Sequence, residues 1–184
     1  MKKTDIYLQH RRFLVAGTRI LPGRKLLDIG SNCCEQAAFL KEKNIQYTGI
    51  DPEPGEGKSP IPEGIAFVRD SFPSEKLLGM QFDYITALAV IEHIPATDLD
   101  AFANGAYDLL KPGGEMILTV PSPLVDYIIH TLRFFHLTDD DMKGHQHYGF
   151  RVGETVPVFS RSGFKLVKRR RFQFGLNNLF VFVK

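Results

Sequence analysis

The sequence predicts an α/β fold in which a mostly parallel, doubly wound sheet has helices on both faces. Short apolar runs alternate with amphipathic stretches along most of the 184 residues, as is typical of strand–helix–strand units. A glycine turn follows the first apolar run, and an acid ends the second run about twenty residues later. The C-terminal segment has two apolar runs, over residues 164–174 and 179–183, joined by Gly175-Leu176-Asn177-Asn178, which predicts an antiparallel hairpin.

Helical and strand-like periodicity locates the other elements. The expected elements are a helix over residues 4–18, a strand over 25–29, a helix over 34–43, a strand over 46–50, a helix over 97–110 and a strand over 115–120. The apolar side of the first helix is expected to comprise Ile6, Phe13, Leu14 and Ile20. Between Asp51 and Ile65 the chain has seven proline or glycine residues. That density excludes a regular helix, so we expect a loop there.

The turn after the first strand indicates a nucleoside site. Gly30 lets the backbone approach a ligand closely, and Asp51 can accept hydrogen bonds from two ribose hydroxyls. A pyrophosphate loop requires Gly-x-Gly-x-x-Gly, whereas this chain has Gly30, Asn32 and Glu35 in those places. A carboxylate beside the ligand would also repel phosphates. The pattern therefore favours a nucleoside that carries a positive charge and no phosphate.

Residues 26–34 resemble motif I of the class I S-adenosylmethionine-dependent methyltransferases. Four further segments resemble that family in the same order: residues 68–73, 82–94, 110–115 and 162–164. The five matches span roughly residues 24–184 and imply a seven-stranded, Rossmann-like sheet with a C-terminal hairpin. The resemblance also implies that the loop between Asp51 and Ile65 replaces a helix of the usual fold.

The resemblance implies S-adenosylmethionine as cofactor and S-adenosylhomocysteine as product. Asp28 would interact with the methionyl ammonium, directly or through water. Asp51 would bind the ribose, and Asp70 with Ser71 would bind the adenine. The residues implied in cofactor binding are Asp28, Gly30, Ser31, Asn32, Asp51, Pro52, Asp70, Ser71 and Leu88. Structural roles stay open beside these, because Asp51 also fits an Asp-Pro turn and Asp70 an exposed loop.

Asn32 and Cys34 occupy places where the family usually has glycine. Both would put larger side chains against the cofactor. Asn tolerates a positive φ angle better than most residues, so Asn32 is an acceptable replacement. Cys34 implies a displaced loop or weaker binding, and a non-catalytic cofactor-binding module stays open as an alternative.

The candidate catalytic side chains are His145, His147 and His93, because imidazole titrates near neutral pH. Methyltransferases of the 2′-hydroxyl of small RNAs carry Glu-x-x-Glu-His here and bind a metal with it. This chain has Ala89 in place of the first glutamate before Glu92-His93, so no metal is expected. An insertion over about residues 122–150 follows the fifth strand and is expected to form the acceptor pocket.

Composition indicates one domain over residues 1–184, with 43% hydrophobic and 24% charged residues. No apolar run approaches the roughly 18 residues of a membrane helix. Cys33 and Cys34 are adjacent and do not pair easily, which fits a reducing cytoplasm. The basic run Lys168-Arg169-Arg170-Arg171 is expected on an edge strand, where charge prevents unwanted strand pairing.

The sequence therefore predicts a cytoplasmic methyltransferase that acts on an oxygen or nitrogen atom of a small molecule or sugar, without a nucleic-acid or membrane partner. Three alternatives stay open. One is an RNA methyltransferase, which the modest net charge of +2 disfavours. The second is a non-catalytic S-adenosylmethionine-binding module. The third is a nicotinamide-dependent oxidoreductase. That class requires a phosphate-tolerant turn, which Asp28 and Asn32 do not provide.

Overall fold

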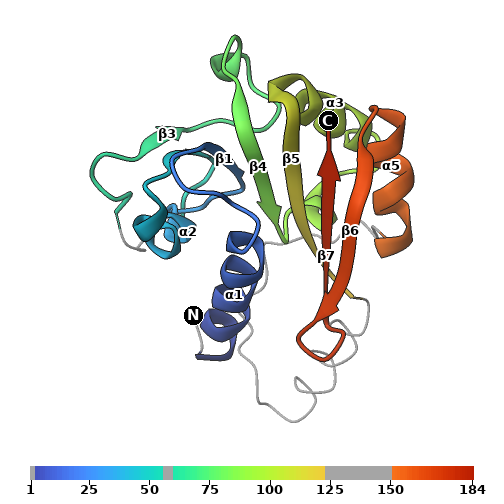
Figure 1. The fold of residues 1–184 in the computed structure, drawn as a ribbon, viewed down its shortest axis with the longest axis horizontal. Helices are drawn as coiled ribbons and strands as arrows, with labels where there is room; N and C mark the ends of the chain where they lie inside the picture. The colour runs from blue at the N-terminus through green and yellow to red at the C-terminus, as the bar shows by residue number, and fades with distance from the viewer. Residues whose placement is uncertain (1–2, 56–59, 123–150) are drawn as a thin grey trace.

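The computed structural model describes residues 3–55, 60–122 and 151–184. It contains a seven-stranded sheet with the order β3-β2-β1-β4-β5-β7-β6 (Figure 1). The strands are β1 (Lys25–Ile29), β2 (Gln46–Ile50), β3 (Ala66–Val68), β4 (Phe82–Leu88), β5 (Leu110–Pro121), β6 (Lys165–Phe172) and β7 (Asn177–Val183). Neighbouring strands from β3 to β5 are parallel, whereas β7 is antiparallel to β5 and β6. The predicted sheet and its terminal hairpin are confirmed.

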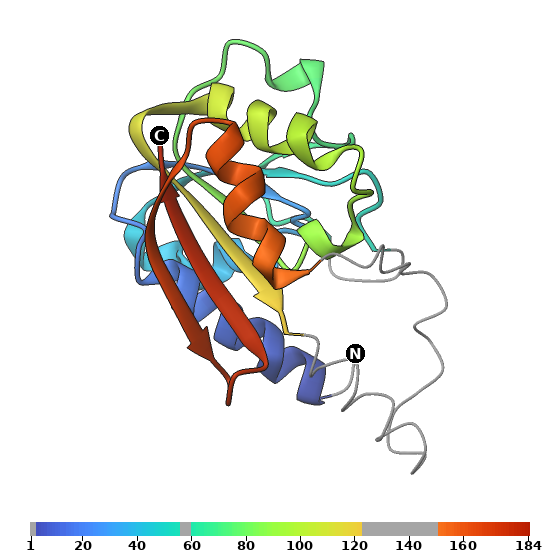
Figure 2. The ribbon, with the colours of Figure 1, turned by 90° about the vertical axis from the view of Figure 1, so that its right-hand side faces the viewer.

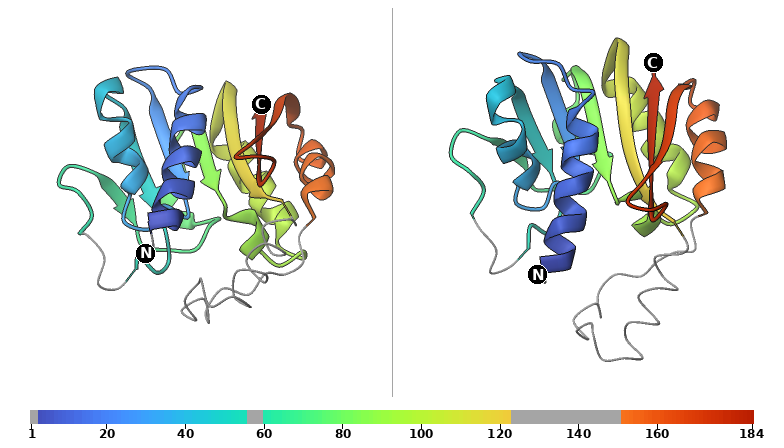
Figure 3. Two further views of the ribbon diagram at one scale, coloured as in Figure 1. Left: turned by 90° about the horizontal axis from the view of Figure 1, so that it is seen from below. Right: turned by 60° about the horizontal axis from the view of Figure 1, so that its bottom comes forward.

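Helices cover both faces of this sheet (Figure 2). The helices are α1 (Lys3–Gly17), α2 (Glu35–Phe39), α3 (Leu99–Leu109) and α5 (Thr155–Arg161), and the short 3₁₀ turns are η1 (Lys41–Lys43), η2 (Glu75–Leu77), η3 (Ile91–His93) and η4 (Val152–Glu154). On one face α1 contacts α2, β4 and β5 (Figure 3). On the other face α3 contacts α5. Among the described residues, no helix is long and apolar enough to cross a membrane.

Two apolar clusters fill the space between the sheet and its helices. Leu26 of β1 belongs to the cluster under α1 and α2, and the next residue, Leu27, belongs to the cluster under α3 and α5. Successive side chains of a strand point to opposite faces, so β1 is buried on both. In the second cluster, Phe159 of α5 stacks on Phe182 of β7 with 5.0 Å between ring centroids. This contact joins the terminal hairpin to the body of the domain.

The order of the strands defines where a ligand can bind. The chain runs outward from β1 to β2 and β3, and then returns to β4 on the opposite side of β1. The connections that leave the carboxyl ends of β1 and β4 therefore diverge. In open α/β sheets, such a switch point leaves a crevice outside the strand ends, where ligands bind.

Two expectations about the helices were partly wrong. Phe13 and Ile20 are buried, but Ile6 and Leu14 are 38% and 51% exposed. In the last turns of α1 the side chains of Phe13 and Ala16 are buried while Leu14 between them is exposed, so the helix turns a different face to the sheet than expected. The helix expected over residues 34–43 is shorter, because Cys34 has a left-handed backbone (φ 61°) and the chain changes to the 3₁₀ turn η1 after Leu40.

The loop predicted after β2 is confirmed where the structure describes it, since residues 51–55 and 60–65 contain no helix. β5 begins at Leu110, earlier than expected, and includes the Pro-Gly-Gly segment that was expected to precede it. The predicted acceptor insertion lies outside the described residues from position 123 to position 150.

The basic run lies on β6, which forms an edge of the sheet as predicted. All residues from Lys165 to Arg171 are exposed. Arg169 pairs with Phe180 and stacks over its ring at 5.1 Å, whereas Lys168 pairs with Val181 on the other face. The positive charges are therefore divided between two faces, which fits protection of an edge strand.

Cys34 fills space that a glycine on β2 leaves open. Its side chain is fully buried in the cluster under α1 and α2. A Cβ atom on Gly49 would lie 2.5 Å from the Cys34 Sγ and 2.6 Å from the Ser31 Oγ. The thiol therefore points into the core and not toward the crevice at the strand ends, contrary to the expectation from the sequence. Burial raises the pKa of the Cys34 thiol to about 11.

Substitution of Gly49 by alanine is expected to lower the free energy of unfolding by about 1–3 kcal/mol, because it forces a methyl group into a packed core. Cys34→Ala removes the sulfur, so the double variant should lose less stability than the sum of the single variants. Urea denaturation measures both effects. Gly153→Ala is the control, because no atom lies within 4 Å of its Cβ position. Strictly additive losses would show that Cys34 and Gly49 are not in contact.

Candidate functional site

The sheet brings several of the predicted site residues to one edge. β1, β2, β3 and β4 are parallel neighbours, so their carboxyl ends lie together. Gly30 follows β1, Asp51 follows β2, Asp70 lies just after β3, and Leu88 ends β4. These are the positions that surround the crevice at the switch point.

Gly30 turns the chain out of β1 in a left-handed conformation at a place with no room for a side chain. Its φ angle is 68°, and its amide donates a 2.9 Å hydrogen bond to the carbonyl of Ile50. A Cβ atom here would lie 2.6 Å from a methyl carbon of Val90, in the loop after β4. Gly30 itself is exposed, so its backbone is accessible to a ligand. The neighbouring Ser31 is buried.

Asn32 joins the turn after β1 to the loop after β2. Its φ angle is 49°, consistent with the expected tolerance of asparagine for this conformation. The backbone amide donates to Asp51 Oδ2 at 2.9 Å, and the side-chain Oδ1 accepts from the amide of Gly55 at 2.8 Å. The side-chain Nδ2 donates to Glu35 at 2.9 Å. Asn32 thus holds the two loops together on one side of the crevice.

Asp51 is held in place by the backbone and remains partly exposed. Oδ2 accepts from the amide of Asn32, and Oδ1 accepts from the amide of Glu53 at 2.9 Å. From the described residues each oxygen accepts one hydrogen bond, so each retains capacity for a ligand hydroxyl. Pro52 follows and is exposed. The geometry is that of a fixed acceptor pair at the end of β2.

Asp28 is buried within β1, with 4% of its surface exposed. Its carboxylate accepts hydrogen bonds from the hydroxyl of Tyr47 on β2 and from Thr86 Oγ1 on β4, the latter at 2.7 Å. Burial raises the pKa of Asp28 to about 7, although the two hydroxyl donors act in the opposite direction. Contact between Asp28 and a cofactor stays a prediction.

Asp70 makes local contacts after β3. It accepts from Ser74 Oγ at 2.8 Å and from the Ser71 amide at 2.9 Å, and it lies 3.4 Å from Lys76 Nζ. The hydrogen bond from Ser74, followed by that from Ser71, lowers the pKa of Asp70. The carboxylate is therefore ionised and available as an acceptor at neutral pH. A role with adenine stays a prediction for Asp70 and Ser71.

The segment after β4 leaves the sheet on the opposite side of β1 from the loop after β2. Leu88 is partly buried, and Ala89 has a left-handed backbone with a φ angle of 60°. Glu92 is buried in η3 beside His93. Among the residues that the structure describes, no group of three or more His, Cys, Asp or Glu side chains could hold a metal. His145 and His147 lie outside the described residues.

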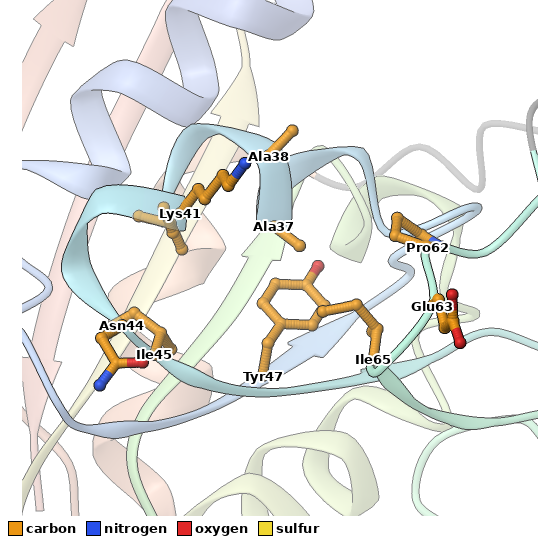
Figure 4. A pocket seen from close by; sticks show the side chains of 10 residues that line it. Ala37, Ala38, Lys41, Asn44, Ile45, Tyr47, Pro62, Glu63 and Ile65 are labelled. Atoms are coloured by element: carbon orange, nitrogen blue, oxygen red, sulfur yellow. The ribbon is translucent and has the colours of Figure 1, made fainter.

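A separate pocket of about 460 Å³ lies beside α2, away from the carboxyl ends of the strands (Figure 4). Ala37 of α2 and Lys41 of η1 line it on one side, Tyr47 projects into it from β2, and Pro62 and Ile65 line it from the segment before β3.

Sequence reasoning missed Tyr47 and Thr86 as partners of Asp28. The available signal was that polar residues recur in the two strands expected beside the first. Their convergence on one carboxylate required the strand order and register.

Comparison with known proteins identifies the family. A model of the methyltransferase domain matches residues 5–173. An uncharacterized methyltransferase of Mycobacterium leprae is 32% identical over 101 residues, which cover 53% of this chain and 37% of that protein. A ubiquinone biosynthesis O-methyltransferase of Pseudomonas aeruginosa is 28% identical over 110 residues, which cover 54% of this chain and 45% of that protein. The matched part is less than half of either curated relative.

A solved structure supports the same fold. The 1,6-didemethyltoxoflavin-N1-methyltransferase of Burkholderia thailandensis, with bound 1,6-didemethyltoxoflavin and S-adenosylhomocysteine, is 15% identical and has a TM-score of 0.68. The comparison covers 98% of this chain and 81% of that one. Since the family model spans most of the sequence and the sheet ends in the expected hairpin, the chain belongs to the methyltransferase domain family, in the S-adenosylmethionine-dependent class I.

Proposed function

We propose that this domain transfers the methyl group of S-adenosylmethionine to an oxygen or nitrogen atom of a small molecule or sugar and releases S-adenosylhomocysteine. The observation that carries the proposal is the bond between the Asn32 amide and Asp51. This bond holds Asp51 next to the glycine turn at Gly30, and Asp51 can accept hydrogen bonds from both ribose hydroxyls. Acid and turn together suit a nucleoside.

The charges around this turn fit a cationic nucleoside better than a dinucleotide. Asp28, Glu35 and Asp51 are carboxylates close enough to act on one another, since Glu35 and Asp51 both raise the pKa of Asp28. Such a group attracts the sulfonium and ammonium charges of S-adenosylmethionine and repels a pyrophosphate. When bound, the cofactor supplies an activated methyl group.

The chain would supply binding and orientation. We assign the ribose to Asp51 and Pro52, the adenine to Asp70 and Ser71, and the methionyl part to Asp28. Gly30, Ser31, Asn32 and Leu88 would form the adjoining walls. Alignment of the acceptor within about 3–3.5 Å of the methyl carbon supplies much of the rate enhancement in such reactions. His93, His145 and His147 remain the candidates for removing a proton from the acceptor.

Two relatives support a small acceptor. The Pseudomonas aeruginosa protein is named an O-methyltransferase of ubiquinone biosynthesis, and the Burkholderia thailandensis protein an N1-methyltransferase of a small heterocycle. One transfers to oxygen and the other to nitrogen, so both atoms stay in the proposal. We also place the protein in the cytoplasm, which the two free thiols of Cys33 and Cys34 support.

Asp51→Asn is expected to weaken S-adenosylhomocysteine binding by about 10- to 100-fold, because hydrogen bonds to a charged acceptor contribute about 1.5–3 kcal/mol. Isothermal titration calorimetry measures the change. Asp100→Asn is the matched control, since Asp100 is an exposed acid on α3 that pairs with Arg161. Equal affinities of the parent and Asp51→Asn would exclude the ribose role. Failure of the parent to bind either adenosyl ligand would exclude the proposed function.

Gly30→Ala is expected to reduce both thermal stability and S-adenosylhomocysteine affinity, the latter at least tenfold. A left-handed alanine costs about 1–2 kcal/mol, and the methyl group would also displace Val90. Gly23→Ala separates these effects, because Gly23 has a φ angle of 71° but no atom within 4 Å of its Cβ position. Thermal melting and calorimetry should show a smaller loss for Gly23→Ala, with affinity retained. Matching behaviour of the two variants would refute the special role of the Gly30 turn.

A further inference from the structure

Three neighbouring strands direct polar side chains to one point in the apolar cluster under α1 and α2. Asp28 of β1 lies directly opposite Thr86 of β4 in the sheet register. Tyr47 lies toward the start of β2 and reaches forward, so that its hydroxyl donates to Asp28 Oδ2. Thr86 Oγ1 donates to the other oxygen, Oδ1. Both carboxylate oxygens are therefore oriented by hydroxyl groups of adjacent strands.

The buried carboxylate has no positive partner among the residues that the structure describes. Among the described parts of the chain, no Lys, Arg or His forms an ion pair with Asp28. The ionisable groups that act on it are Tyr47, Glu35 and Asp51, and the thiol of Cys34 is close by. On α2, Gln36 Oε1 lies 3.1 Å from Thr86 Oγ1, as a second and longer acceptor beside Asp28 Oδ1. An ionised acid in such a place is costly unless a cation compensates it.

Tyr47 is placed to set the orientation of the Asp28 carboxylate. Its ring lines the pocket beside α2 next to Ile65 (Figure 4), while its hydroxyl reaches the Asp28 carboxylate. The ring is thus not enclosed by core atoms on every side, and the bond to Asp28 fixes its inner end. Burial raises the pKa of Tyr47 well above its usual value, so the hydroxyl remains a donor at neutral pH.

We propose that Tyr47 is a positioning residue, which holds Asp28 as an oriented, ionised carboxylate for the ammonium group of the adenosyl cofactor, directly or through a bridging water. Thr86 assists at the second oxygen. The inference rests on the proposed function, because it requires a cofactor with a positively charged amino-acid end. It adds two residues outside motif I to the cofactor site.

The proposal predicts a pH dependence with a definite sign. Asp28 attracts a cation only when ionised, and its pKa is about 7 in the free protein. Affinity for S-adenosylhomocysteine should therefore rise between pH 6 and pH 8.5. The hydroxyl of Tyr47 favours the ionised form, so Tyr47→Phe raises the pKa of Asp28 further and moves this rise to higher pH. The affinity ratio of parent to variant should be largest at the acid end of this range, near pH 6, and should shrink toward 1 at pH 8.5.

Calorimetric titration with S-adenosylhomocysteine at several pH values tests the inference. Tyr47→Phe should weaken binding about tenfold at pH 7, which corresponds to loss of one hydrogen bond. Thr86→Val should act in the same direction, and Asp28→Asn should flatten the profile. Tyr84→Phe is the matched control, since Tyr84 is also buried in this cluster but has no hydrogen bond to Asp28. Titration of the ligand itself affects all variants equally and cancels in the ratios.

The outcomes are distinguishable. A loss of affinity in Tyr47→Phe that is the same at every pH would show a merely structural role and overturn the inference, as would unchanged affinity. No binding to the parent at any pH would overturn the proposed function and the inference together. A second measurement uses the free protein and follows the Asp28 carboxyl by ¹³C NMR. This carboxyl should titrate at higher pH in Tyr47→Phe than in the parent. An unchanged Asp28 pKa would overturn the inference independently of any ligand.

Discussion

The parallel pairing of β1 between β2 and β4 is the constraint on which the candidate site depends. In this register Ile29 lies opposite Ile50, so the turn at Gly30 and the acid at Asp51 leave the sheet side by side. Side chains alternate along a strand, and a slip of one residue would turn Asp28 toward the opposite face. Burial of β1 on both faces opposes such a slip. The crevice and the buried acid network are therefore consequences of one strand arrangement.

Electrostatics connects this arrangement with function. Burial raises the pKa of Asp28 from its ordinary value to about 7, so its contribution to stability is present at low pH and is lost as pH rises through 7. At neutral pH the free protein thus holds a destabilising partial charge in its interior. A ligand cation would offset that cost on binding, since a group that binds only the folded state stabilises it. The same carboxylate would then weaken the free fold and strengthen cofactor binding.

The departures from glycine in the turn are accommodated by local contacts. Asn32 and Cys34 both adopt left-handed backbone angles, as glycine would. The Asn32 side chain uses this position to bind the amide of Gly55, and the Cys34 thiol fills the space above Gly49. Each residue thereby gains a contact that glycine lacks. One closes the rim of the crevice and the other packs the core behind it.

The sequence by itself determined the alternation of strands and helices, the glycine turn, the acid after the second strand and the terminal hairpin, because periodicity and turn residues are local properties. It also placed the basic run on an edge strand. It misjudged Ile6 and Leu14, since the spacing of apolar residues does not say which side chains of a helix reach the sheet.

Only the tertiary structure decided that Cys34 points inward and that Tyr47 and Thr86 converge on Asp28. Such contacts depend on strand order, register and the reach of a side chain across neighbouring strands. Alternation along each separate strand leaves these undetermined.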